Sequence, residues 1–142
     1  IKRALRHVRG KQFFATYGDG VANVDIAALY ETHQQRGLEA TVTAVHPSSR
    51  YGEIDIREGA VHTFQEKPQV GSGWINGGFF VFEREVFERA SENPKMVLET
   101  DILPPLAQNQ QLAAFNHDGF WQCMDTYREM QMLNEMWQSG RA

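Results

Sequence analysis

The chain has 142 residues, of which 42% are hydrophobic and 23% are charged, a composition typical of one globular domain with a core of its own. Its net charge of −4 argues against nucleic acid or an anionic membrane as the main partner, and no apolar run approaches the roughly 20 residues that cross a bilayer. Cys123 is the single cysteine, which excludes a disulfide framework and a thiolate zinc cluster and fits a reducing cytoplasm.

The first half of the chain predicts alternating strands and helices. The opening segment IKRALRHVRG has no initial methionine and reads as a cut through a larger protein, with trimming of the expressed protein as the alternative. A short apolar run closed by glycine predicts a buried strand in KQFFATYG (11–18). VDIAALYETHQQRG (24–37) predicts a helix that Asp25 caps and Gly37 ends. EATVTAVHP (39–47) is β-branched and predicts a strand that ends at Pro47.

The second half continues with a hairpin and further strand–helix pairs. Alternation of apolar and polar residues around Glu58-Gly59 predicts a hairpin in GEIDIREGAVHTFQEKP. The remaining expected elements are a strand at 77–83, a helix at 84–93, a helix at 97–110 broken at Pro104-Pro105, a strand at 112–119 and an amphipathic helix at 126–140. This order predicts an α/β fold with a mixed, mostly parallel sheet flanked by helices.

Two aspartates follow predicted strands, where ligands collect in such sheets. Asp19 lies in the segment YGDG, and Asp125 lies in the loop FWQCMDT before the last helix. Two carboxylates of this kind are a plausible magnesium site, because Mg²⁺ prefers hard oxygen ligands completed by phosphates and water. The alternatives are that Asp19 is a turn residue and that Asp125 caps the closing helix. Capping and metal binding do not exclude each other, since a carboxylate has two oxygens.

Two further segments carry polar groups suited to a sugar phosphate. In QEKP (65–68), Glu66 could bind a sugar hydroxyl and Lys67 a phosphate, although an exposed Glu-Lys pair before a turn is commonplace. In WINGGFFVF (74–82), Asn76 and the backbone of the two following glycines could face a hydroxylated ligand; a tight turn is the alternative.

In the order YGDG, EKP, INGG and FWQCMDT, these segments resemble the sugar-nucleotide pyrophosphorylases, a family of nucleotidyltransferases. The resemblance runs over nearly the whole chain and is strongest for the members that use CTP and glucose 1-phosphate. It rests on TYGDGVANVDI, on ATVTAVHP followed by Tyr51-Gly52, on FQEKP, on INGGFFVF and on the tail from GFWQCMDT to Trp137. It implies a Rossmann-like, glycosyltransferase-A-like nucleotidyltransferase fold, with residues 1–142 as the downstream part of a single domain.

The resemblance also implies roles for individual residues. Asp19 and Asp125 match the two metal-binding aspartates, and with Lys67, which holds the sugar phosphate, they form the expected catalytic set. The other expected substrate-binding residues are Thr16 and Gly18 near the nucleotide or phosphate, Glu66 on the hexose, and Gly52 and Asn76 in the sugar pocket.

The implied reaction joins CTP and α-D-glucose 1-phosphate, with Mg²⁺ as cofactor, into CDP-glucose and pyrophosphate. CDP-glucose would feed 3,6-dideoxyhexose synthesis for surface polysaccharide such as the O-antigen of lipopolysaccharide. The resemblance further implies a cytoplasmic homo-oligomer whose partners are small-molecule substrates, without nucleic acid or membrane.

The chain departs from the family in its nucleotide-binding elements. The family opens with a glycine-rich loop, G-G-x-G-T-R, and a following Lys-Pro element, and neither occurs in these 142 residues. We therefore expect both upstream of Ile1, an unpaired sheet edge in their absence, and slow or no turnover by this chain alone. Two alternatives stay open: the same fold with another nucleotide or hexose 1-phosphate, and a non-catalytic domain that binds sugar phosphates.

Overall fold

The computed structural model describes residues 1–47, 53–57, 59–65 and 73–140, and for residues 53–57, 64 and 65 it describes the backbone alone. The elements are η1 (Lys2–His7, a 3-10 helix), β1 (Gln12–Thr16), β2 (Gly20–Ala22), α1 (Ile26–Arg36), β3 (Ala40–Val45), β4 (Glu53–Arg57), β5 (Ala60–Gln65), β6 (Ile75–Glu83), α2 (Arg84–Arg89), η2 (Leu98–Ile102, a π-helix), α3 (Leu103–Gln108), β7 (Leu112–His117), β8 (Trp121–Cys123) and α4 (Tyr127–Gln138). Among the described residues, no helix combines the length and apolar character needed to cross a membrane.

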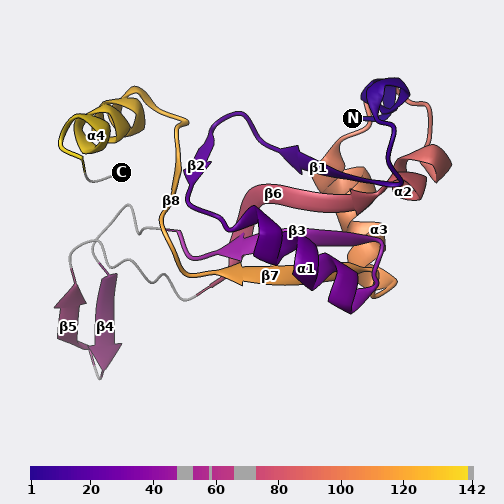
Figure 1. The fold of residues 1–142 in the computed structure, drawn as a ribbon. Helices are drawn as coiled ribbons and strands as arrows, with labels where there is room; N and C mark the ends of the chain where they lie inside the picture. Colours follow the sequence, from indigo (N-terminus) through magenta and orange to yellow (C-terminus); the bar gives the residue numbers. More distant parts are fainter. Residues whose placement is uncertain (48–52, 58, 66–72, 141–142) are drawn as a thin grey trace.

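The main sheet has four strands in the order β1-β6-β3-β7 (Figure 1). Strand β6 is antiparallel to both β1 and β3, and β3 is parallel to β7. Three strands therefore run in one direction and β6 runs against them, which confirms the mixed sheet expected from the sequence. The predicted hairpin is also present, as β4 paired antiparallel with β5.

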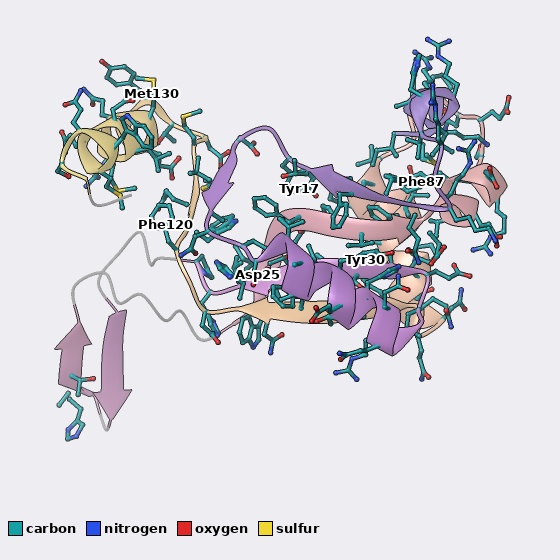
Figure 2. The ribbon with its side chains drawn as sticks, in the orientation of Figure 1. Tyr17, Asp25, Tyr30, Phe87, Phe120 and Met130 are labelled. Atoms are coloured by element: carbon teal, nitrogen blue, oxygen red, sulfur yellow. The ribbon has the colours of Figure 1, made fainter. Side chains whose placement is uncertain are left out.

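Helices cover both faces of this sheet. Helix α1 lies across one face, in front of β3 and β7 in Figure 1. The other face carries the main hydrophobic core, in which Phe80 and Phe82 of β6 pack against α2 and α3. Successive residues of a strand point to opposite faces, so alternate residues of the run FFVF pack on the two faces of the sheet. In Figure 2, Phe87 of α2 lies within this core and Tyr30 lies on α1.

Helix α1 begins and ends where the sequence predicts. The Asp25 carboxylate accepts a hydrogen bond from the backbone N–H of Ala28 (2.9 Å), and Gly37 ends the helix in the left-handed region with φ of 59°. One turn before this end, His33 is buried and its Nδ1 lies 2.9 Å from the Thr41 hydroxyl oxygen. This contact joins α1 to β3.

The predicted break at Pro104-Pro105 is present as a change of helix type. The π-helix η2 ends at Ile102, and α3 begins at Leu103 with its two prolines in the first turn. Proline is tolerated there because the first N–H groups of a helix have no partner within it.

Two short strands were not predicted. The segments expected to be a turn after Asp19 and a loop before Asp125 contain β2 and β8, which pair antiparallel with each other. Beyond this pair lies α4, which has no buried residue and stands apart from the main sheet in Figure 1. Thr126 caps α4, so the alternative that Asp125 is the capping residue is wrong.

Candidate active site

The β2–β8 pair brings Asp19 and Asp125 to one cavity. Asp19 directly precedes β2, and the backbone N–H of Met124, next to Asp125, donates to the carbonyl oxygen of Asp19 (2.8 Å). Gly20 lies opposite Cys123 in the ladder. The cavity has a volume of about 440 Å³ and is lined by Tyr17, Asp19, Gly20, Pro47, Ile75, Asn76, Gly77, Trp121, Gln122, Cys123, Asp125 and Glu129. The two aspartates expected to bind metal therefore share one cavity.

The start of β6 forms the opposite wall of this cavity. Val42 of β3 pairs with Phe80, but Ala44 pairs with Asn76, so β6 bulges across its two glycines. Gly78 has φ of +79°, and a Cβ there would lie 2.6 Å from Cδ2 of Tyr17. A Cβ on Gly77 would lie 2.7 Å from Cγ1 of Val45. Positive φ at Gly78 and close packing at both positions thus explain the pair within strand β6, and the alternative of a tight turn is wrong.

Asn76 is held at this bulge by hydrogen bonds at both ends of its carboxamide. Its Oδ1 accepts from the backbone N–H of Gly78 (2.9 Å), and its Nδ2 donates to the hydroxyl oxygen of Tyr17 (2.9 Å). The Tyr17 hydroxyl in turn donates to the carboxylate of Glu99. Partial burial and the hydrogen bond to Glu99 raise the pKa of Tyr17 to about 12, so the phenol is neutral at physiological pH.

Trp121 of β8 joins the β8 wall of the cavity to the β6 wall by a hydrogen bond. Its indole N–H donates to the carbonyl oxygen of Gly77 (2.8 Å), which lies within the bulge of β6. The indole thus lies between the strand that carries Asn76 and the strand that precedes Asp125. Tyr17 was not expected at the site from the sequence.

Glu129 was also not predicted to contribute to the site, although the sequence contains the pattern of a capping box. One carboxylate oxygen, Oε2, accepts from the backbone N–H groups of Asp125 and Thr126, both at 2.9 Å. Thr126 accepts from the backbone N–H of Glu129, which completes a capping box. A threonine followed three residues later by glutamate is the usual sign of this motif. Glu129 thereby fixes the backbone that carries Asp125.

The charge of the cavity favours a divalent cation. Its described lining contains Asp19, Asp125 and Glu129 and, in that part of the chain, neither lysine nor arginine. Ligand atoms of Cys123, Asp125 and Glu129 lie within 4.8 Å of one another. Thiolate sulfur is a poor ligand for magnesium, and Glu129 is engaged by backbone N–H groups. Asp19 and Asp125 each bring a carboxylate to the cavity, and hard oxygen ligands of this kind suit Mg²⁺.

The remaining expected residues fall into two groups. Thr16 lines a separate apolar cavity on the α1 side of the sheet, and its hydroxyl donates to the carbonyl oxygen of Tyr17 (3.1 Å). Gly18 adjoins Asp19, and a Cβ on it would meet no atom within 4 Å, which leaves open space there. Three expected residues lie outside the described ones: Gly52, Glu66 and Lys67.

Similar proteins share both the sequence and the fold. A family model described as nucleotidyl transferase matches residues 1–135. The glucose-1-phosphate cytidylyltransferase of Salmonella typhimurium (strain LT2) is 44% identical over 100% of this chain and 55% of its own length. The probable glucose-1-phosphate cytidylyltransferase of Bacillus subtilis (strain 168) is 37% identical over 99% of this chain and 55% of its own length. The chain thus spans about half the length of the curated relatives it matches.

A solved structure supports the same fold. HddC from Yersinia pseudotuberculosis aligns with a TM-score of 0.69 at 21% sequence identity, covering 96% of this chain and 60% of that chain. At this identity the likeness concerns the fold alone.

Proposed function

Because the chain belongs to the nucleotidyl transferase family, we propose that it supplies the metal-binding and sugar-phosphate side of a cytidylyltransferase site. The proposed reaction transfers a cytidylyl group from CTP to α-D-glucose 1-phosphate and yields CDP-glucose and pyrophosphate. The choice of substrates is supported by the names of the two relatives, which are 44% and 37% identical over nearly all of this chain.

One observation carries the proposal more than any other. Asp19 and Asp125 come from opposite ends of the chain, yet the β2–β8 pair and the Met124-to-Asp19 hydrogen bond bring both to one cavity. Neither residue caps a helix, and a domain that bound only sugar phosphates would not need both carboxylates. Their convergence therefore favours an enzyme over a non-catalytic binding domain.

The chemistry asks the protein for alignment and charge neutralisation. The attacking oxygen of glucose 1-phosphate is already anionic, so no strong general base is required. We assign Asp19 and Asp125 as ligands of Mg²⁺, which would neutralise charge on the phosphate oxygens when bound. We assign Lys67 to the sugar phosphate, where it would reduce the repulsion between two anionic reactants. Glu66, Asn76 and Gly52 would bind or line the hexose, and Gly18 would leave room for a phosphate.

The wider setting belongs to the same proposal. CDP-glucose would serve dideoxyhexose synthesis for O-antigen, in the cytoplasm, where CTP is available. The whole protein would act as a homo-oligomer. Because no G-G-x-G-T-R segment occurs in these 142 residues, we expect this chain alone to turn over very slowly or not at all.

The proposal is tested by binding and turnover on one preparation. Isothermal titration calorimetry should show CTP binding that requires Mg²⁺ and that Asp19→Asn weakens by about tenfold or more, as expected for loss of a paired charge. Asp118→Asn is the matched control, since Asp118 is exposed, follows β7 and does not line the cavity. Equal effects of the two substitutions, or CTP binding without Mg²⁺, would contradict the metal assignment.

Substrate choice needs a separate readout. Pyrophosphate release is measured with CTP, UTP, GTP and dTTP, each with glucose 1-phosphate or mannose 1-phosphate. We expect the highest rate, however slow, with CTP and glucose 1-phosphate. A preference for another pair would replace the cytidylyl assignment with a different nucleotidyl transfer, and rapid release by this chain would refute the expected low turnover.

A further inference from the structure

We propose that Tyr17 and Glu99 are positioning residues that fix the carboxamide of Asn76 in one orientation, so that Asn76 presents an N–H donor to an acceptor oxygen of the sugar phosphate. The inference rests on the proposed function, because it concerns the same cavity and names how that cavity recognises its sugar. Neither Tyr17 nor Glu99 was expected to contribute.

The direction of every hydrogen bond in this group follows from the atoms themselves. A backbone N–H can only donate, so the atom of Asn76 next to the N–H of Gly78 must be the oxygen Oδ1. The nitrogen Nδ2 is then the atom that lies 2.9 Å from the Tyr17 hydroxyl, and it must donate to that oxygen. The single proton of the Tyr17 hydroxyl is consequently directed to the Glu99 carboxylate.

Three contacts fix the position of Tyr17. Its backbone N–H donates to the carbonyl oxygen of Gly78 (2.9 Å), and its ring packs edge-on against Phe80, with ring centroids 5.5 Å apart. The third contact is the close approach of the ring to Gly78. In Figure 2, Tyr17 lies at the end of β1 beside β6. The hydroxyl therefore cannot follow Asn76 if the carboxamide turns, and it selects one orientation.

This orientation defines what Asn76 can offer a ligand. Of the two hydrogens on Nδ2, one is used by Tyr17, which leaves one donor available beside the cavity. A flipped carboxamide would place its oxygen against the Tyr17 hydroxyl and leave the N–H of Gly78 without an acceptor. The fixed donor fits the oxygen of a sugar hydroxyl or of the phosphate.

The test compares Tyr17→Phe with Tyr30→Phe in this chain. Tyr30 is a matched control, because its hydroxyl donates to Gln12 on the α1 side of the sheet and takes no part in the cavity. Calorimetry with glucose 1-phosphate should show about two- to tenfold weaker binding for Tyr17→Phe, the range for one neutral hydrogen bond, and no change for Tyr30→Phe. Equal affinity of Tyr17→Phe and the unsubstituted chain would overturn the proposal.

A second pair of variants tests the role of Glu99. Glu99→Gln keeps an oxygen that can accept from the Tyr17 hydroxyl, whereas Glu99→Ala removes it. We expect near-normal binding for the glutamine variant and weaker binding for the alanine variant. Equal loss in both would show that the charge of Glu99, not its hydrogen bond, matters, and would refute its positioning role.

A readout without ligand separates this inference from the proposed function. Nuclear magnetic resonance can follow solvent exchange of the Asn76 side-chain N–H groups, which should be faster in Tyr17→Phe than in the unsubstituted chain. If glucose 1-phosphate does not bind at all, the proposed function fails, but faster exchange would still support the fixing of Asn76. Unchanged exchange would overturn it, whatever the sugar does.

Discussion

Among the described glycines with positive φ, Gly78 is the one at which replacement by alanine should destabilise the protein most. Gly78 has φ of +79°, and an added Cβ would lie 2.6 Å from Cδ2 of Tyr17 and 3.1 Å from its Cγ. The contacting atoms belong to a ring that is held by Phe80 and by a backbone hydrogen bond. The clash therefore cannot be relieved by rotation of a flexible chain end.

The expected cost has two parts. A non-glycine residue in the left-handed region costs about 1 to 2 kcal/mol. Forcing an extra methyl group into packed surroundings costs a further 1 to 3 kcal/mol, roughly. Gly37→Ala carries only the first part, because Gly37 has φ of +59° and a Cβ there would meet nothing within 4 Å. The difference between the two variants thus isolates the contact with Tyr17.

Urea unfolding followed by tryptophan fluorescence measures both variants under one set of conditions. We expect Gly78→Ala to lose roughly 2 to 5 kcal/mol of unfolding free energy and Gly37→Ala about 1 to 2 kcal/mol. If the two variants lost the same amount, the ring of Tyr17 would not be packed against the bulge, and the argument for a fixed Asn76 would lose its steric part.

Three further outcomes are expected. Glu129→Ala should destabilise the protein by about 1 kcal/mol, because it removes the acceptor for the backbone N–H of Asp125. Calorimetry should also show that this variant needs a several-fold higher Mg²⁺ concentration to bind CTP. Glu135→Ala, on the same helix, is the control for both effects. The contribution of Tyr17 to the unfolding free energy should be constant below about pH 10 and fall between pH 10 and 12, since its unfolded phenol ionises near 10 while the folded one holds its proton until about 12. The difference in urea unfolding free energy between the unsubstituted chain and Tyr17→Phe measures this contribution, and a difference that does not change between about pH 10 and 12 would contradict it. Trp121→Phe should lower the free energy of unfolding by about 1 kcal/mol, because it removes the indole hydrogen bond to the β6 backbone. Thermal unfolding measures this loss, and an unchanged free energy of unfolding would show that the bond is dispensable.

Features encoded by neighbouring residues were predictable from the sequence. Asp25 and Gly37 bound helix α1 as expected, because capping depends on a few consecutive residues. At the start of α4, two adjacent residues could each cap the helix. Asp125 and Thr126 are both good capping residues, and only the glutamate three positions after Thr126 decides between them.

Features that depend on distant residues were predictable only in part. Asp19 and Asp125, both expected at strand ends where ligands collect, line one cavity. The strands that hold them there have three residues each, too few for a periodic pattern, so β2 and β8 were missed. The hydrogen bonds of Asn76 depend on a bulge that arises from the packing of β6 against β3, which local propensity does not encode.

The pairing of β2 with β8 has a consequence for the stability of the chain's tail. Helix α4 has no buried residue, so among the described elements its attachment depends largely on the short β8 ladder and the loop that carries Asp125. A ligand bound by both Asp19 and Asp125 would add its binding free energy to that attachment, and its release would lower the free energy of local opening. Hydrogen exchange of the α4 amides would then report whether the cavity is filled.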